Sequence, residues 1–272
     1  MNTIIENSLY KNDPARFQYL RKCVRDFSTS YVGSNIIQDD IFSILRNFAE
    51  KNKNHLELIK LPIQDDDFCA FTCIRSGEFF TVLNSSLPLS KQIYAAAHEL
   101  YHVYCYVSDQ DDSLTHNGSL LTADHLDEET VTQEDMEANA FAALLLVPSA
   151  ALIEQLDVYD IDRRNITLND IVKLMDIFAV PFKAIVLRML EENILDERAA
   201  EQLIQEGTEE NLTRSMTRQY VALRWQKRPC DVDVGLLTSL LQQNQEEGRL
   251  PDNRIYEDRE ILHNLIAPYT RK

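Results

Sequence analysis

The sequence lacks a long uninterrupted hydrophobic run, and this absence argues against a membrane-spanning helix. The longest apolar stretch, residues 138–153, is interrupted by Asn139, Pro148 and Ser149, whereas a bilayer needs about 20 consecutive apolar residues. The N-terminus also lacks a basic segment followed by an apolar block, so no secretory signal peptide is predicted. We therefore expect a cytoplasmic protein without a membrane partner.

Cysteine and basic residues are also scarce. The five cysteines among 272 residues form no C-x-x-C pair, which favours reduced thiols. The net charge of −17 argues against direct nucleic-acid binding, because that function needs Lys and Arg to displace counterions. It is compatible with a basic protein as partner or substrate. With 44% apolar and 26% charged residues, the composition is that of an ordinary globular protein with one large or two modest domains.

The most informative segment is His-Glu-Leu-Tyr-His at residues 98–102. Two histidines four residues apart lie on one face of a helix, so both imidazoles can reach a single metal ion. Glu99 adjoins the first histidine and can act as a base toward water at that metal. Helix-forming alanines and apolar spacing predict a helix over Lys91–Val107, with Ser90 as its N-cap. The alternative is a buried helix whose histidines only form hydrogen bonds.

A catalytic zinc needs a third protein ligand, and a second helix offers candidates. The sequence pattern of residues 134–147 predicts a mostly apolar helix that ends before Pro148. Glu134 and Glu137 share a face of this helix, so either can reach the histidines if the two helices pack side by side. Glu134 also suits the ordinary place of carboxylates at a helix N-terminus. Glu137 adjoins the apolar run, where a buried carboxylate needs a partner such as a metal.

These two segments resemble the ImmA/IrrE family of metallopeptidases. The similarity lies in residues 98–102 and in the run Glu-Ala-Asn-Ala-Phe-Ala-Ala-Leu-Leu-Leu-Val-Pro at residues 137–148, and it extends from Ile36 to Leu195. The resemblance implies a zincin-like fold and a protein substrate, a helix-turn-helix repressor whose cleavage or release relieves repression. It also implies a set of site residues, with zinc ligands at His98, His102 and Glu137 and the catalytic base at Glu99.

Four residues near this site have roles that the sequence leaves open. Tyr101 stands where the family usually has glycine, and it can alter packing behind the metal or narrow the cleft. Like Glu134, it is a candidate for contact with a metal ligand. His116 and His125 lie in residues 109–137, which hold ten carboxylates and no Lys or Arg. Either histidine can donate a hydrogen bond to a developing oxyanion. The donor set suits Zn²⁺ best, with Mn²⁺ or Fe²⁺ as alternatives.

The order of predicted elements indicates an α+β fold with a zincin-like core and an all-helical C-terminal region. Short strands are predicted at 56–61, 68–74 and 79–83, with a turn at Ser76–Gly77 between the last two. We predict four segments: an N-terminal helical segment at 1–50, the metallopeptidase core at 51–150, a helical segment resembling a helix-turn-helix at 151–204, and a helical region of unknown role at 205–272.

Two further segments bear on partners. The strand at 79–83 is our candidate for a place beside the active site where an extended peptide binds through main-chain hydrogen bonds. The helical pair within residues 168–190 resembles a DNA-binding motif. Its second helix offers only Lys183 and Arg188 as basic residues, so a structural pair is favoured over a DNA reader.

These patterns favour a cytoplasmic zinc endopeptidase that cleaves or inactivates a partner protein, with Glu99 moving the proton during hydrolysis. A second hypothesis is a non-catalytic, metal-stabilised binding module that disarms a repressor by binding alone. A third is a transcription factor that uses the helical pair directly. The effect of changing Glu99 separates the first hypothesis from the second.

Overall fold

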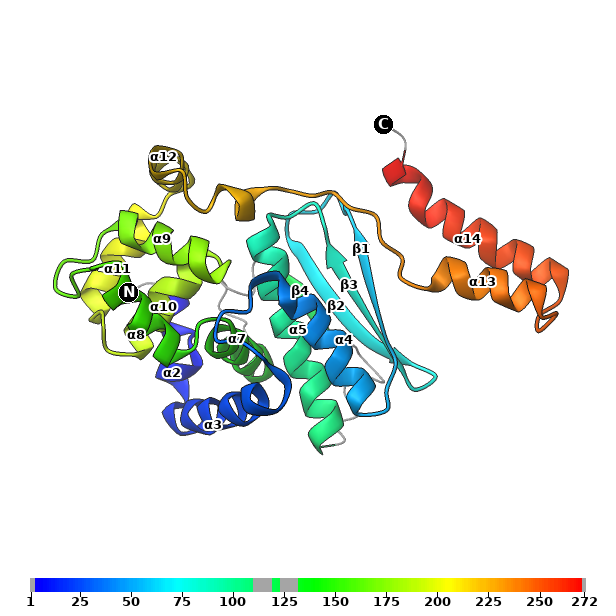
Figure 1. The fold of residues 1–272 in the computed structure, drawn as a ribbon, viewed down its shortest axis with the longest axis horizontal. Coiled ribbons are helices and arrows are strands. Elements are labelled where there is room, and N and C mark those ends of the chain that lie inside the picture. The colour runs from blue at the N-terminus through cyan, green and yellow to red at the C-terminus, as the bar shows by residue number, and fades with distance from the viewer. Residues whose placement is uncertain (1–2, 110–118, 123–131, 271–272) are drawn as a thin grey trace.

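The computed structural model describes residues 3–109, 119–122 and 132–270. His116 and His125, considered above as oxyanion donors, lie outside these residues. The domain boundaries given above stay predictions. The α+β fold class is confirmed, because a mixed sheet and its covering helices are followed by an all-helical C-terminal region (Figure 1).

A four-stranded sheet forms one layer of the molecule. Its strands, in spatial order, are β1 (Leu56–Leu61), β3 (Glu78–Asn84), β2 (Phe68–Arg75) and β4 (Ser119–Thr122). β1 runs parallel to β3, and the other two pairings are antiparallel. Ser76 and Gly77 have φ angles of 53° and 83°, and two consecutive positive values are what a tight type I′ hairpin turn requires.

The position of β3 corrects the prediction that residues 79–83 bind a peptide. β3 lies between β1 and β2, so both rows of its backbone groups are already paired. Among the described strands the sheet ends at β1 and β4, and Asp233 pairs with Lys60 on the outer side of β1, with N–O distances of 2.7 and 2.9 Å. Strand order depends on long-range pairing, which local sequence does not encode.

Two helices cover one face of the sheet, and two more stack beyond them. α4 (Ile41–Lys51) and α5 (Leu89–Asp109) lie on the sheet, α7 (Gln133–Leu146) packs against α5, and α3 (Pro14–Tyr31) packs against α7 (Figure 1). The first turn of α5 is closed by the Pro88 carbonyl, so Ser90 is not the N-cap that we predicted. The helix begins at Leu89, two residues before the predicted start at Lys91. The Leu89 N–H donates to the carbonyl of Lys227, a residue distant in the sequence (3.0 Å).

The remaining N-terminal and central helices form a second lobe beside α7. They are α1 (Thr3–Glu6), α2 (Leu9–Asn12), α8 (Ser149–Val158), α9 (Leu168–Phe178), α10 (Phe182–Glu191), α11 (Glu197–Glu206) and α12 (Glu209–Gln219); η1 (Gln38–Asp40) precedes α4. α9 and α10 correspond to the helix-turn-helix-like pair. Most of α10 is buried and Arg188 is fully inaccessible, so this helix does not present the face that a DNA reader needs.

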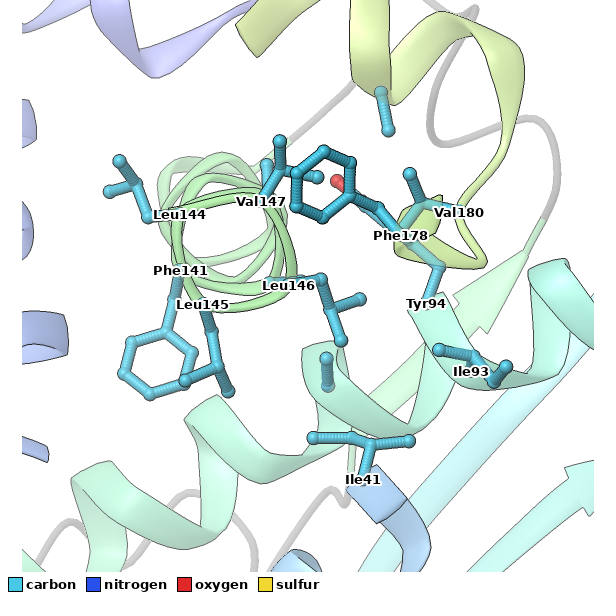
Figure 2. Close-up of a cluster of buried hydrophobic side chains, with 14 of the residues drawn as sticks. Ile41, Ile93, Tyr94, Phe141, Leu144, Leu145, Leu146, Val147, Phe178 and Val180 are labelled. Atoms are coloured by element: carbon cyan, nitrogen blue, oxygen red, sulfur yellow. The ribbon is translucent and has the colours of Figure 1, made fainter. Parts of the chain in front are cut away.

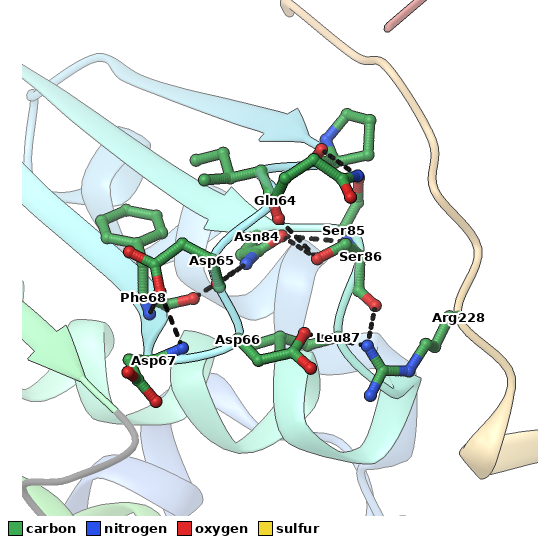
Figure 3. A network of polar contacts seen from close by, with 12 residues as sticks. Gln64, Asp65, Asp66, Asp67, Phe68, Asn84, Ser85, Ser86, Leu87 and Arg228 are labelled. Atoms are coloured by element: carbon green, nitrogen blue, oxygen red, sulfur yellow. Dashed lines mark hydrogen bonds and ion pairs between the residues drawn. The ribbon is translucent and has the colours of Figure 1, made fainter.

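The C-terminal region crosses from the helical lobe to the sheet and then projects away from it. η3 (Leu223–Gln226) anchors the crossing through Trp225, whose indole N–H donates to the Asp176 carbonyl (2.8 Å). Arg228 then binds Asp66 (2.9 Å) and the Ser86 carbonyl (3.1 Å) at the polar network that joins the β1–β2 loop to the start of α5 (Figure 3). The hairpin of α13 (Leu237–Glu246) and α14 (Asp252–Thr270) follows.

The structure shows how basic residues of the C-terminal region are paired and how the most apolar helices are arranged. Three basic residues of the C-terminal region form ion pairs with acidic residues, namely Arg214 with Glu210, Arg224 with Asp176, and Arg228 with Asp66. Within the described ranges, no single helix is both long and apolar enough to cross a membrane; α7 and α8 pass that test of length and composition only together, and they are bent by 45° where they join.

Candidate metal centre

His98 and His102 lie one turn apart on α5, and their rings face the same point. Their Nε2 atoms are 3.2 Å apart, and both side chains are almost completely buried. A tetrahedral ion with Zn–N bonds of about 2.0–2.1 Å holds two nitrogens roughly 3.3 Å apart. The spacing of the two Nε2 atoms is therefore the spacing that one bound divalent ion requires.

The other nitrogen of each ring is held by an oxygen from α7. His98 Nδ1 lies 2.9 Å from Asn139 Oδ1, and His102 Nδ1 lies 2.8 Å from Glu134 Oε1. Because these oxygens accept hydrogen bonds, each Nδ1 donates a proton and each Nε2 keeps its lone pair for a metal. The structure thus places Glu134 against a histidine of the candidate metal site, one of the positions considered for it from the sequence.

The carboxylate that completes this group belongs to Asp135. Its Oδ1 lies 4.0 Å from His98 Nε2, and the potential ligand atoms of His98, His102 and Asp135 all lie within 4.8 Å of one another. Asp135 and Asn139 are four residues apart and share one face of α7. The same helix face therefore orients His98 through Asn139 and supplies a carboxylate oxygen to the site.

Glu137, which the family resemblance implied as the third ligand, is not brought into this group. Its carboxylate accepts hydrogen bonds from Arg16 of α3 (2.7 Å), from the Tyr101 hydroxyl and from Gln133 (3.1 Å). Two residues along an α-helix rotate the side-chain direction by about 200°, so Glu137 and Asp135 cannot face the same point. The donor group that can hold a metal is thus His98, His102 and Asp135. In the sequence, the four-residue spacing of Asp135 and Asn139 indicates that their side chains share one face of a helix. This spacing was the sequence signal for Asp135 as a member of the donor group.

Negative charge dominates the surroundings of the two imidazoles. Glu99 is fully buried beside His98. Burial lowers the pKa of His102, but the nearby carboxylates of Glu134, Glu99 and Asp135 outweigh this effect and raise the pKa overall. A group of carboxylates around two buried imidazole nitrogens is a suitable environment for a divalent cation.

Tyr101 packs behind the metal group, between α5 and α7. Its ring centroid lies 5.5 Å from that of Phe141 and 5.8 Å from that of His102. Burial is the main cause that raises the pKa of Tyr101, so the hydroxyl stays protonated and donates to Glu137. Burial also raises the pKa of Glu137, but hydrogen bonds from Arg16, Tyr101 and Gln133 outweigh it and lower the pKa overall.

A comparison with known protein families matches the part of the chain that contains this site. Residues 78–190 match the model of the IrrE N-terminal-like domain, of the M78 peptidases. The match includes both α5 and α7, and therefore His98, Glu99, His102 and the carboxylates of α7. This region is therefore similar to an IrrE N-terminal-like domain. The resemblance to the ImmA/IrrE-type metallopeptidases is thereby confirmed. The matched region begins at β3 and ends within α10. No curated protein matches the chain.

Proposed function

We propose that this protein is a zinc-dependent endopeptidase of the cytoplasm. The observation that carries the proposal is the 3.2 Å separation of the His98 and His102 Nε2 atoms, with the Asp135 carboxylate beside them. His98, His102 and Asp135 would hold the metal. Zinc, when bound to such a donor set, activates water and polarises the scissile carbonyl.

The remaining chemistry falls to side chains of the two helices. Glu99 takes a proton from the attacking water and delivers it to the leaving amide nitrogen as the C–N bond breaks. Glu134 and Asn139 keep the imidazole rings in the orientation that directs both Nε2 atoms to the site. Removing Glu99 therefore takes away proton transfer but leaves the metal-binding group complete.

The substrate in this proposal is a protein, specifically a helix-turn-helix repressor whose cleavage relieves repression. Support comes from the peptidase family of residues 78–190 and from the net charge of −17, which attracts a basic DNA-binding partner. An extended substrate segment would pair with β4, which ends the sheet on the β2 side among the described strands. Support for the cytoplasm comes from the five cysteines, none of which forms a disulfide bond.

The test compares wild type with Glu99→Gln after purification with repressors encoded by neighbouring genes. Fragment masses report cleavage, and metal analysis reports occupancy. We expect the variant to retain metal and lose at least about a hundredfold in cleavage rate. Cleavage at the wild-type rate would overturn the assignment of Glu99. Relief of repression by the uncleaving variant would instead support a metal-stabilised module that acts by binding alone.

A further inference from the structure

Three helices meet at the carboxylate of Glu137. Arg16 reaches it from α3 at 2.7 Å, and the Tyr101 hydroxyl reaches the same oxygen, Oε2, from α5. The carboxyl group is mostly buried, with 10% of the Glu137 side chain exposed. We call Arg16, Tyr101 and Glu137 the brace. Tyr101 belongs to the same helical turn as the two histidines, so the brace begins on the metal-binding helix itself.

Hydrophobic burial gives α7 little preference for any one rotation about its axis. The helix buries nine of its residues, and eight of these are Ala, Leu or Phe. Figure 2 shows α7 almost end-on, with apolar side chains leaving it in several directions toward neighbouring elements. An α-helix that is apolar on most of its circumference can bury a similar area after turning. Its rotation must then be chosen by polar contacts.

The polar contacts of α7 form two groups. In one group Glu134 and Asn139 hold the two imidazoles, and Asp135 points to the same place. In the other group Glu137 is held by the brace. A turn of about 100°, one residue along the helix, would remove Asp135 from the histidines. A buried polar contact with fixed partners disfavours such a turn, because the turn would leave its groups unsatisfied.

We propose that the brace sets the rotation of α7 and that Glu137 is thereby a positioning residue for Asp135, not a metal ligand. The inference rests on the metal site of the proposed function. It also gives a role to Tyr101, which stands at a position where the ImmA/IrrE family usually has glycine. The tyrosine hydroxyl gives α5 a direct contact with α7 that is separate from the contacts of the two imidazoles.

The test is titration of the metal-free protein with Co²⁺, whose visible absorption reports both affinity and ligand geometry. Tyr101→Phe removes one hydroxyl, Glu137→Gln removes the charge, and Arg16→Met removes the cation. Each is expected to lower Co²⁺ affinity by about 10- to 100-fold, the range for residues that orient metal ligands, and to change the absorption intensity. Arg16→Lys, which keeps the cation, should recover part of the loss.

Tyr104→Phe is the matched control. Tyr104 lies three residues along α5, and its ring also contacts Phe141, with centroids 5.6 Å apart, but its hydroxyl is outside the brace. This variant should bind Co²⁺ like wild type. Urea unfolding of each metal-free variant separates loss of positioning from loss of fold, and Tyr101→Phe keeps the ring in place if the charged variants fold poorly.

Three outcomes would overturn the brace. Wild-type affinity and absorption in both Tyr101→Phe and Glu137→Gln would show that it positions nothing. Loss of affinity in Glu137→Gln alone, with Tyr101→Phe and Arg16→Met unchanged, would make Glu137 a ligand. An equal loss in Tyr104→Phe would show a general packing effect. A wild-type protein that binds no Co²⁺ would instead overturn the metal site and the proposed function.

Discussion

Buried polar groups gather at both ends of α7, and the two clusters differ in the source of their positive charge. Near the start of the helix, His98 and His102 face Asp135. Past its end, Arg188 is fully buried and binds Glu191, Glu192 (2.7 Å), the Ser149 hydroxyl (3.1 Å) and the Val147 carbonyl (3.1 Å). The second cluster contains its own cation, whereas the first has the donors that take a divalent metal.

The difference shows that burial of polar groups does not by itself indicate a reactive site. In the Arg188 cluster the guanidinium satisfies the carboxylates, so its role is to join α10 to the end of α7 and the start of α8. In the metal cluster the donors are imidazole nitrogens and a carboxylate oxygen that converge on one point. Donor chemistry and convergence, and not burial, therefore separate a candidate metal centre from a structural ion-pair network.

The largest effect on stability is expected from Arg188→Met. The change leaves the Glu191 carboxylate buried without its cation, and Glu192 keeps only its ion pair with Arg21 (2.9 Å), which should lower the free energy of unfolding by about 3–5 kcal/mol. Urea unfolding measures it. The control is Arg214→Met, which breaks an exposed pair with Glu210 and should change the free energy by less than about 0.5 kcal/mol. Equal stability of the two variants would contradict a structural role for the buried cluster.

Asp135→Asn should produce the opposite pattern, in which metal binding is lost and stability is kept. Because a charged ligand is removed, affinity for Zn²⁺ or Co²⁺ should fall by more than about a hundredfold, beyond the loss expected for an orienting residue. The metal-free protein should unfold at the same or higher urea concentration, since one charge leaves an acidic group. Asp157→Asn, at an exposed position, is the control. Unchanged metal affinity in Asp135→Asn would exclude Asp135 as a ligand.

The smallest effect should come from a cap remote from both clusters. The N–H and hydroxyl of Thr167 donate to the Asp170 carboxylate (3.1 and 2.6 Å). Burial raises the pKa of Asp170, but the hydrogen bonds from Thr167 and the contact with Lys173 outweigh it, and the pKa lies below the usual 3.8. The ionised carboxylate therefore stabilises the fold above that value, and the contribution disappears as the pH falls through the folded-state pKa.

Asp170→Asn should cost about 1 kcal/mol at pH 7, and the difference from wild type should shrink as the pH falls below about 4. Urea unfolding across this pH range measures both quantities. Asp26→Asn, at a mostly exposed position, should differ little from wild type at any pH. A cost for Asp170→Asn that stays constant down to pH 2 would show that ionisation of Asp170 contributes nothing.

Local sequence patterns predicted much of this molecule. The short strands at 56–61, 68–74 and 79–83, the turn at Ser76–Gly77 and the two metal-site helices all appear where the patterns indicate them. The capping box of Thr167 and Asp170 is equally local, since the two residues are three positions apart. These features depend on residues within one or two turns of each other, and the covalent geometry of the backbone sets their spacing.

Tertiary structure alone decided which groups meet. It put β3 inside the sheet, joined Leu89 to the Lys227 carbonyl and brought Arg16 to Glu137. It also decided which carboxylate of α7 faces the histidines. The sequence by itself determined that two imidazoles share a helix face and that acidic residues begin the next helix. The choice of Asp135 over Glu137 needed the rotation of an apolar helix, which only contacts from distant segments can fix.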